Sequence, residues 1–259
     1  KQVGSVLFCC ASPLTDLIIE CHEISATTGI EIKTLPCRVQ KLELVAPDVM
    51  IISLKLPANQ RLQFLPGQYI DILLKDGRRR SFSLANAPHD DEFLQLHARN
   101  YSGGAFAEYV FTQMKVKDML RFTGPLGSFF LRDASEETAI IFLASGTGFA
   151  PIKSILEHVF FQESNRNSKR KMTLYWGART KADLYLADLA DKWQQQHDNF
   201  TFVPVLSEPL STDNWLGRTG LVHEAVMQDF HNLAVHQVYA CGVPVMVKAA
   251  YHDFTSQCH

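Results

Sequence analysis

The chain has 259 residues, which is the usual length of one large domain or of two ordinary ones. Apolar residues make up 46% of it and charged residues 20%, with 14 glycines and 11 prolines, which excludes a disordered, collagen-like or low-complexity protein. A formal net charge of −2 and dispersed Lys and Arg residues argue against a nucleic-acid-binding surface. The longest wholly apolar run, residues 139–144, is far shorter than the roughly 18 residues of a membrane span, so we expect none.

The cysteines are too sparse for a disulfide-stabilised scaffold and have neither the CxxC nor the Cys/His spacing of a zinc site. They are Cys9, Cys10, Cys21, Cys37, Cys241 and Cys258. We therefore expect reduced thiols in a cytoplasmic protein. Because the chain starts at Lys1 without a charged and apolar leader, we expect a fragment of a longer protein and not a secretory precursor.

Residues 1–34 contain little that could form a domain. One strand-like stretch, 16–20, and a polar run, 25–29, are too short to bury a core. We expect a tail followed by a linker in this part of the chain.

Residues 35–134 alternate short β-type runs with turns rich in Pro, Gly and Asp. The expected strands cover residues 38–45, 49–56, 68–74, 80–84, 93–98 and 119–123. Their number and spacing predict a six-stranded antiparallel β-barrel. One helix, over 104–113, interrupts the strands.

Residues 135–259 have a different rhythm, in which strands alternate with helices. The expected strands cover 139–144, 172–176, 200–206 and 237–241, and the expected helices cover 150–162, 182–197, 220–229 and 244–256. This alternation predicts an α/β domain with a doubly wound parallel sheet. We place the boundary between the two domains within residues 132–137.

The carboxyl ends of parallel strands are where an open α/β sheet binds ligands, and glycine follows three of the four strands as Gly146, Gly177 and Gly242. Gly146 and Gly148 also precede a helix, whose N–H groups and dipole suit a pyrophosphate. A dinucleotide site is one interpretation, and a tight turn without a ligand is the other. Cys241, at the end of the last strand, is either a site residue or a small buried apolar side chain.

In the barrel, Arg80-Ser81-Phe82-Ser83 opens a strand in which Arg80 and Phe82 share a face. Arg80 suits a phosphate group and Phe82 a ring beside it, although a solvated arginine on a plain strand is the alternative. Tyr69 is a candidate of the same kind or simply part of the barrel core. The glycines before the barrel helix suit a second phosphate, or else Ser102 caps that helix.

Five motifs in one order resemble the ferredoxin-NADP reductase superfamily, nearest its bacterial NAD(P)H-flavin reductases, the CDP-6-deoxyglucoseen reductase-like proteins and the reductase components of oxygenases. They are Pro66-Gly67-Gln68-Tyr69, Arg80-x-Phe82-Ser83, Gly146-Thr147-Gly148-x-x-Pro151, Trp176-Gly177-Ala178-Arg179 and Tyr239-x-Cys241-Gly242-x-Pro244-x-Met246. The resemblance runs from about residue 36 to the C-terminus. It implies a flavin-binding barrel at 35–134 and an NAD(P)-binding domain at 135–259.

The resemblance also implies roles for individual residues. Arg80 would bind a flavin phosphate, Phe82 would lie against the flavin, and Ser83 would hydrogen-bond near the flavin N5. Cys241 would face the nicotinamide C4, so that Ser83 and Cys241 are the expected catalytic pair. The other expected cofactor-binding residues are Tyr69, Gly103, Gly104, Ala105, Gly146, Thr147, Gly148, Pro151, Gly177, Arg179 and Gly242.

The function implied is hydride transfer from NAD(P)H to a flavin, FAD rather than FMN, followed by electron transfer to an iron–sulfur centre or another acceptor. A free flavin reductase and a non-catalytic redox-sensing module are the alternatives. NADH is favoured over NADPH, because the acidic Asp183 and Glu208, as well as the basic Arg179 and Lys181, follow the second and third expected strands of the sheet.

Residues 7–16, Leu-Phe-Cys-Cys-Ala-Ser-Pro-Leu-Thr-Asp, resemble the last stretch of a plant-type [2Fe-2S] ferredoxin domain. By that resemblance Cys9 is the fourth cluster ligand, and residues 1–34 are a remnant of the ferredoxin domain plus a linker. One thiolate cannot hold the cluster, so we expect no metal site in this fragment and a [2Fe-2S] centre only in a longer parent protein. The expected partners are therefore a nicotinamide dinucleotide and an acceptor protein or attached [2Fe-2S] domain.

Overall fold

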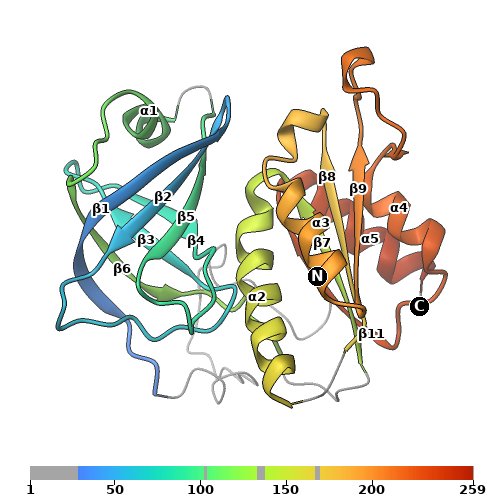
Figure 1. Ribbon diagram of the computed structural model, residues 1–259, viewed down its shortest axis with the longest axis horizontal. Helices are drawn as coiled ribbons and strands as arrows, with labels where there is room; N and C mark the ends of the chain where they lie inside the picture. The colour runs from blue at the N-terminus through green and yellow to red at the C-terminus, as the bar shows by residue number, and fades with distance from the viewer. Residues whose placement is uncertain (1–28, 102–103, 133–137, 167–169, 259) are drawn as a thin grey trace, which may run out of the picture. The chain divides into compact units, whose positions relative to one another are not determined.

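The computed structural model describes residues 29–101, 104–132, 138–166 and 170–258 (Figure 1). Contacts divide the chain into Lys1–Ile30 and Glu31–His259, and every element described below belongs to the second unit. The proposed ferredoxin remnant with Cys9 lies outside the described residues, as does Gly103. None of the helices in the described ranges is long and apolar enough to cross a membrane.

The first half of this unit is a six-stranded antiparallel barrel, as predicted. Its strands are β1 (Lys33–Ala46), β2 (Val49–Lys55), β3 (Tyr69–Leu73), β4 (Arg79–Ser83), β5 (Leu94–Arg99) and β6 (Met119–Leu126). Hydrogen bonds join them in the order β4-β3-β6-β1-β2-β5, and a bridge between Leu84 and Leu96 connects the two outer strands. The sheet therefore curls until its edges meet, which leaves neither edge strand exposed along its whole length.

Strand β1 shows why the barrel forms. Its alternating residues Leu35, Cys37 and Val39 are buried while their neighbours are exposed, which is the period of two that lines a barrel interior. The strand begins at Lys33 rather than at residue 38, because Lys33–Cys37 pairs with β6 before the pairing with β2 starts at Arg38. Helix α1 (Ala105–Thr112) adds Phe106 to the same apolar core.

The second half is a five-stranded parallel sheet with helices on both faces, which confirms the predicted fold class. Its strands are β7 (Ala139–Ser145), β8 (Met172–Ala178), β9 (Phe200–Leu206), β10 (Arg218–Thr219) and β11 (His236–Cys241), in the order β10-β9-β8-β7-β11. Its helices are α2 (Phe149–Arg166), α3 (Ala187–Gln196), α4 (Val222–Asp229) and α5 (Pro244–Gln257).

Strand β7 lies inside this sheet and is buried on both faces. Ile140 and Phe142 belong to the core shared with α2 and α3, whereas Ile141 and Leu143 belong to the core shared with α4 and α5. A continuous apolar run is the expected sequence for such a strand. The chain leaves β7 toward β8 on one side and returns as β11 on the other, so the sheet changes winding direction at β7.

Two details differ from the sequence-based expectation. The two-residue strand β10 was not predicted, because two residues carry no periodicity. The helix expected over 182–197 is split into a 3-10 turn, Lys181–Asp183, and α3. The backbone N–H and the hydroxyl of Thr180 both donate to the Asp183 carboxylate across that turn. These hydrogen bonds cap the turn as a unit separate from α3.

Helix α2 connects the two halves. On one side, Lys153 donates to the Ala85 carbonyl at 3.1 Å and Ser154 donates to the Asn86 carbonyl at 2.7 Å. Ile155 packs against Gly67, where an added Cβ would lie 3.1 Å from the Ile155 Cδ1. The other side of α2 lies in the core of the sheet, so this helix is packed between the barrel and the sheet (Figure 1).

Candidate active site

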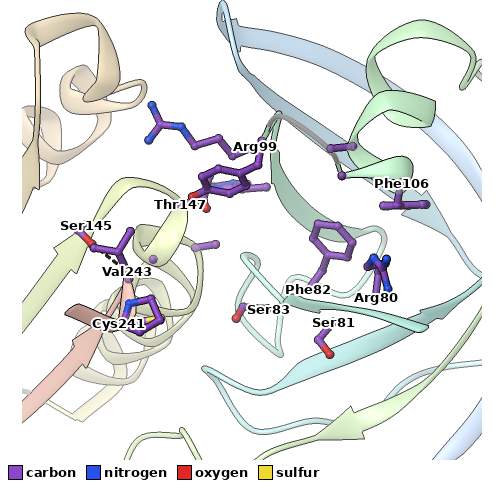
Figure 2. A pocket seen from close by; sticks show the side chains of 18 residues that line it. Arg80, Ser81, Phe82, Ser83, Arg99, Phe106, Ser145, Thr147, Cys241 and Val243 are labelled. Carbon is purple, nitrogen blue, oxygen red and sulfur yellow. Dashed lines mark hydrogen bonds between the residues drawn. The ribbon is translucent and has the colours of Figure 1, made fainter. Parts of the chain in front are cut away.

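A cavity of about 620 Å³ lies at the seam between the barrel and the parallel sheet (Figure 2). Arg80, Phe82 and Ser83 line it from β4, Thr147 lines it from the turn after β7, and Cys241 lines it from the end of β11. Its volume is in the range of ordinary cofactor sites. Two segments more than 60 residues apart in sequence thus form one site.

The barrel wall combines an aromatic surface with a fixed cation. The ring of Phe82 lies 5.3 Å from that of Phe106 in a tilted arrangement, and both line the cavity. The half-buried Arg80 donates to the Arg79 carbonyl at 2.8 Å and lies beside Phe82 (Figure 2). A planar ring system that carries phosphates, as a flavin does, fits this set of donors and rings.

The sheet wall is formed by two backbone turns in close contact. Ala144 of β7 pairs with Cys241 of β11, so the strands end side by side. A Cβ on Gly148 would lie 2.2 Å from the Cys241 carbonyl oxygen, and therefore no other residue fits there. The 3-10 turn Gly146–Gly148 leads directly into α2. The free backbone N–H groups and the positive end of the helix dipole at this N-terminus suit an anion.

A second cavity, of about 700 Å³, adjoins the first along the carboxyl ends of β7, β8 and β9. Gly146, Gly177, Arg179 and Glu208 line this second cavity. Four residues line both cavities, namely Arg99, Tyr101, Ser145 and Val243. An elongated ligand with two ring systems joined by phosphates fits this pair of connected spaces.

Arg99, at the end of β5, stands where the two cavities meet. Its Nε donates to the Asp48 carboxylate at 2.6 Å, and its Nη2 donates to Asp183 beyond β8. Burial opposes its charge, yet the two carboxylates hold the pKa of Arg99 above its ordinary value. Its Nη1 lies only 2.9 Å from where a Cβ on Gly146 would be, so the guanidinium lies over the first glycine of the turn.

His97 and Tyr185 form a neutral hydrogen bond between the barrel and the sheet. The His97 Nδ1 and the Tyr185 hydroxyl are 2.8 Å apart, and both side chains are buried. Burial, with a smaller contribution from the charge of Lys153, lowers the pKa of His97 to about 3. His97 also lines the first cavity, so near neutral pH it adds a polar but uncharged group there.

Cys241 is likewise neutral. Burial raises the pKa of its thiol to about 11, so that the thiolate is rare near pH 7. The arrangement therefore does not favour nucleophilic chemistry at Cys241. Its thiol provides a small, polarizable contact surface at the cavity wall.

Most of the residues singled out in the sequence line one of the two cavities. The first cavity is lined by Arg80, Phe82, Ser83, Gly104, Thr147, Gly148, Cys241 and Gly242, and the second by Gly146, Gly177 and Arg179. Tyr69 and Pro151 line neither cavity. The Tyr69 ring lies against Gly127, and Pro151 is buried in the first turns of α2, while Ala105 begins α1.

Sequence reasoning missed several lining residues. They include His97, Arg99, Tyr101, Phe106, Ser145 and Val243 in the first cavity and Asp48, Thr180, Ser207, Gly220 and Val222 in the second. Arg99 was not detectable because its carboxylate partners are 51 and 84 residues away. In the described part of the chain, no group of three or more His, Cys, Asp or Glu side chains could hold a metal ion.

Comparison with known families agrees with this geometry. Residues 36–131 match the oxidoreductase FAD-binding domain, and residues 142–252 match the oxidoreductase NAD-binding domain. The chain belongs to the family of oxidoreductases that combine these two domains. It is an NAD(P)H-dependent flavoprotein reductase whose cofactors are FAD and a nicotinamide dinucleotide. The expected family, fold class, function and cofactors are thereby confirmed.

Individual relatives have related names. The chain is 40% identical over 251 residues to the CDP-6-deoxy-L-threo-D-glycero-4-hexulose-3-dehydrase reductase of Yersinia pseudotuberculosis, which covers 97% of this chain and 73% of the relative. It is 35% identical to reductase component 1 of a Comamonas terephthalate 1,2-dioxygenase, over 94% of this chain and 70% of the relative. The crystal structure of the Amycolatopsis cytochrome P450 reductase GcoB superposes with a TM-score of 0.79 at 30% identity, over 86% of this chain and 66% of that one.

The buried neutral His97 predicts a specific dependence of stability on pH. In the unfolded chain its pKa is near 6.5, whereas the folded chain keeps it neutral down to about pH 3. Below pH 6.5 the unfolded state therefore binds a proton that the folded state excludes, and stability is lost as the pH falls. Between pH 7 and pH 5 this loss amounts to about 2 kcal/mol.

A His97→Gln variant keeps a hydrogen-bonding group for Tyr185 but cannot titrate. We expect urea unfolding at pH 7 and pH 5 to show a loss in the parent that exceeds the loss in the variant by about 2 kcal/mol. All other titrating groups are common to the two proteins and cancel in the comparison. Equal losses in both proteins would show that His97 is accessible to protons in the folded state.

Proposed function

We propose that the seam cavity is where this chain transfers a hydride from NADH to FAD before the electrons leave for an iron–sulfur acceptor. The observation that carries the proposal is that one cavity is lined by the barrel and by the carboxyl ends of the parallel strands together. Bound FAD accepts two electrons as a hydride and releases them one at a time. The protein's contribution is to hold the two reacting rings in contact and to exclude water.

The barrel residues are proposed to hold FAD. Arg80 binds a flavin phosphate, Phe82 and Phe106 supply the apolar surface for the ring system, and the Ser83 hydroxyl donates to its polar edge. We assign Gly103, Gly104 and Ala105 to the pyrophosphate of FAD, which is also the reason that FAD is expected rather than FMN. Tyr69 lines neither cavity. It would act only by supporting Ser83, because Tyr69 of β3 pairs with Ser83 of β4.

The dinucleotide is proposed to lie across both cavities. Its nicotinamide lies in the first cavity beside Cys241 and Gly242, and its adenosine lies in the second beside Gly177 and Arg179. The phosphates between them then meet the turn of Gly146, Thr147 and Gly148 at the start of α2, with the guanidinium of Arg99 opposite. Pro151, near the start of α2, is proposed to support the turn Gly146–Gly148 that precedes the helix.

Ser83 and Cys241 are proposed to act on the chemical step. They come from the barrel and from the sheet, so each contacts a different cofactor. The neutral Cys241 thiol restricts the nicotinamide position without adding a charge, and Ser83 provides a hydroxyl donor at the flavin side.

An acceptor that is itself a protein or an attached domain fits the names of the relatives, which are reductases of a dehydrase and of a dioxygenase. We infer that residues 1–34 comprise a remnant of a ferredoxin-like domain, with Cys9 as a [2Fe-2S] ligand in a longer parent, and a linker to the barrel. The barrel and sheet domains would then be residues 35–134 and 135–259. A cytoplasmic location is inferred too, and is supported by the free thiols of Cys37, Cys241 and Cys258.

Arg80 is expected to carry flavin affinity. Arg80→Ala removes a charge-assisted contact worth about 1.5 to 3 kcal/mol, so the Kd for FAD should rise roughly ten- to a hundredfold. Arg79→Ala is the matched control, because Arg79 is its exposed neighbour on β4 and lines neither cavity. Titration of the flavin-free proteins with FAD measures both. An unchanged Kd in Arg80→Ala would remove Arg80 from the flavin site.

Ser83→Ala and Cys241→Ala are expected to keep the thermal midpoint of the parent but to slow reduction of the flavin. Anaerobic mixing with NADH measures this as bleaching of the flavin absorbance. Ser164→Ala serves as the control, because Ser164 lines neither cavity and its hydroxyl donates to the Phe160 carbonyl at 2.9 Å within α2. If both variants are reduced at the parental rate, Ser83 and Cys241 have no part in the chemical step.

The choice of dinucleotide is set in the second cavity, where Arg179 and Glu208 lie near the expected adenosine. Asp183 is paired with Arg99, so Glu208 is the acidic group available for a free ribose 2′-hydroxyl. We expect a higher kcat/KM with NADH than with NADPH, and a smaller preference in Glu208→Gln. A tenfold preference for NADPH that disappears in Arg179→Ala would reverse the assignment and make Arg179 a phosphate ligand.

A further inference from the structure

The turn after β11 is attached to the end of β7 by a serine side chain. Ser145 is the last residue of β7, and its Oγ accepts a hydrogen bond from the backbone N–H of Val243 at 2.9 Å (Figure 2). Val243 lies two residues beyond Cys241 and is the N-cap of α5. The bond therefore joins two turns that approach each other at the cavity wall.

Gly242, between Cys241 and Val243, shows how closely this turn lies against Ser145. Its φ of +152° is in the region that favours glycine, and an added Cβ would lie 2.0 Å from the Ser145 Oγ. The same Cβ would lie 2.9 Å from the backbone N of Ser145. The serine side chain thus occupies the space beside Gly242, and the turn has no room to shift toward β7.

The backbone of Cys241 is held on its other side as well. Its carbonyl oxygen abuts Gly148, where a Cβ would be only 2.2 Å away, and the pairing with β7 ends at Cys241. Beyond that pair, the hydrogen bond of the Val243 amide to Ser145 is what connects the turn to β7. Removing the Ser145 hydroxyl would free the segment that follows Cys241 while leaving the strand pairing intact.

We propose that Ser145 is a positioning residue for hydride transfer, which holds the Cys241 thiol at the cavity wall through the amide of Val243. The proposal rests on the function proposed above for Cys241. Ser145 also lines both cavities, so direct contact with the dinucleotide is the competing role that the experiment must separate.

The hydrogen bond itself is tested by amide hydrogen exchange, without reference to activity. In Ser145→Ala, with FAD bound and no dinucleotide present, exchange of the Val243 amide should accelerate roughly two- to tenfold, the equivalent of one ordinary hydrogen bond. Ser164→Ala is the control, because the Ser164 hydroxyl bonds only to the Phe160 carbonyl within α2. Unchanged exchange at Val243 in Ser145→Ala would overturn the proposal.

The positioning role is tested by separating binding from chemistry in single-turnover reduction. Ser145→Ala should lower the rate constant of flavin reduction about three- to tenfold, while the Kd for NADH stays within about twofold of the parent. A raised Kd with an unchanged rate constant would make Ser145 a dinucleotide contact and overturn the positioning role. In a Cys241→Ala background, Ser145→Ala should have little further effect, because both changes act through the same thiol.

Two further outcomes of these experiments lead to different conclusions. Full additivity of Ser145→Ala and Cys241→Ala would overturn a route through Cys241. If Cys241→Ala alone leaves the reduction rate unchanged, the role proposed for Cys241 fails and the positioning role of Ser145 fails with it. In that case, accelerated exchange of the Val243 amide in Ser145→Ala would show that the hydrogen bond stabilises the turn and nothing more. Unchanged exchange would show instead that the hydrogen bond does not protect this amide.

Discussion

The packing of α2 between the barrel and the sheet is the constraint on which the site depends. The first turns of this helix continue from Gly146–Gly148, and its middle, through Lys153, Ser154 and Ile155, contacts the barrel segments around Gly67, Ala85 and Asn86. The position of the turn Gly146–Gly148 relative to the barrel wall of the cavity therefore depends on this helix. A helix that moved away from the barrel would separate the two walls and abolish the cavity, even with each domain intact.

Charge is distributed along the two cavities in a way that fits the cofactors. Near the middle, where the reacting rings would meet, the titratable groups are neutral: His97 because burial lowers its pKa, and Cys241 because burial raises its pKa. The cations Arg80 and Arg99 lie to either side, and each faces the place proposed for a phosphate. In the proposed placement, the two fixed charges would hold the phosphates, and the absence of a nearby charge at the centre would avoid stabilising one charge state of the rings over another.

Sequence reasoning succeeded where the signal is local. The number and spacing of the short β-type runs predicted the barrel, the alternation of strands with helices predicted the parallel sheet, and glycines after strands located Gly146, Gly177 and Gly242 at one edge of that sheet. It failed where the partner is distant or the element is short. The pairs of Arg99 with Asp183 and of His97 with Tyr185 are formed only once the barrel and the sheet have packed together, and no spacing in the sequence encodes them.

Other contacts between distant segments show how an ordinary thiol can contribute to a redox site. Cys241 is neither a metal ligand nor an activated nucleophile, so any contribution to rate must come from where its sulfur is held. Its place is fixed by a strand pair, by the absence of a side chain at Gly148 and by the turn attached to Ser145. Each of these restraints originates in the sheet, whereas Ser83 is fixed by β4 of the barrel. The two groups line one cavity because α2 and the pairs of Arg99 with Asp183 and of His97 with Tyr185 join the barrel to the sheet, so the geometry proposed for the chemical step depends on the packing at the seam.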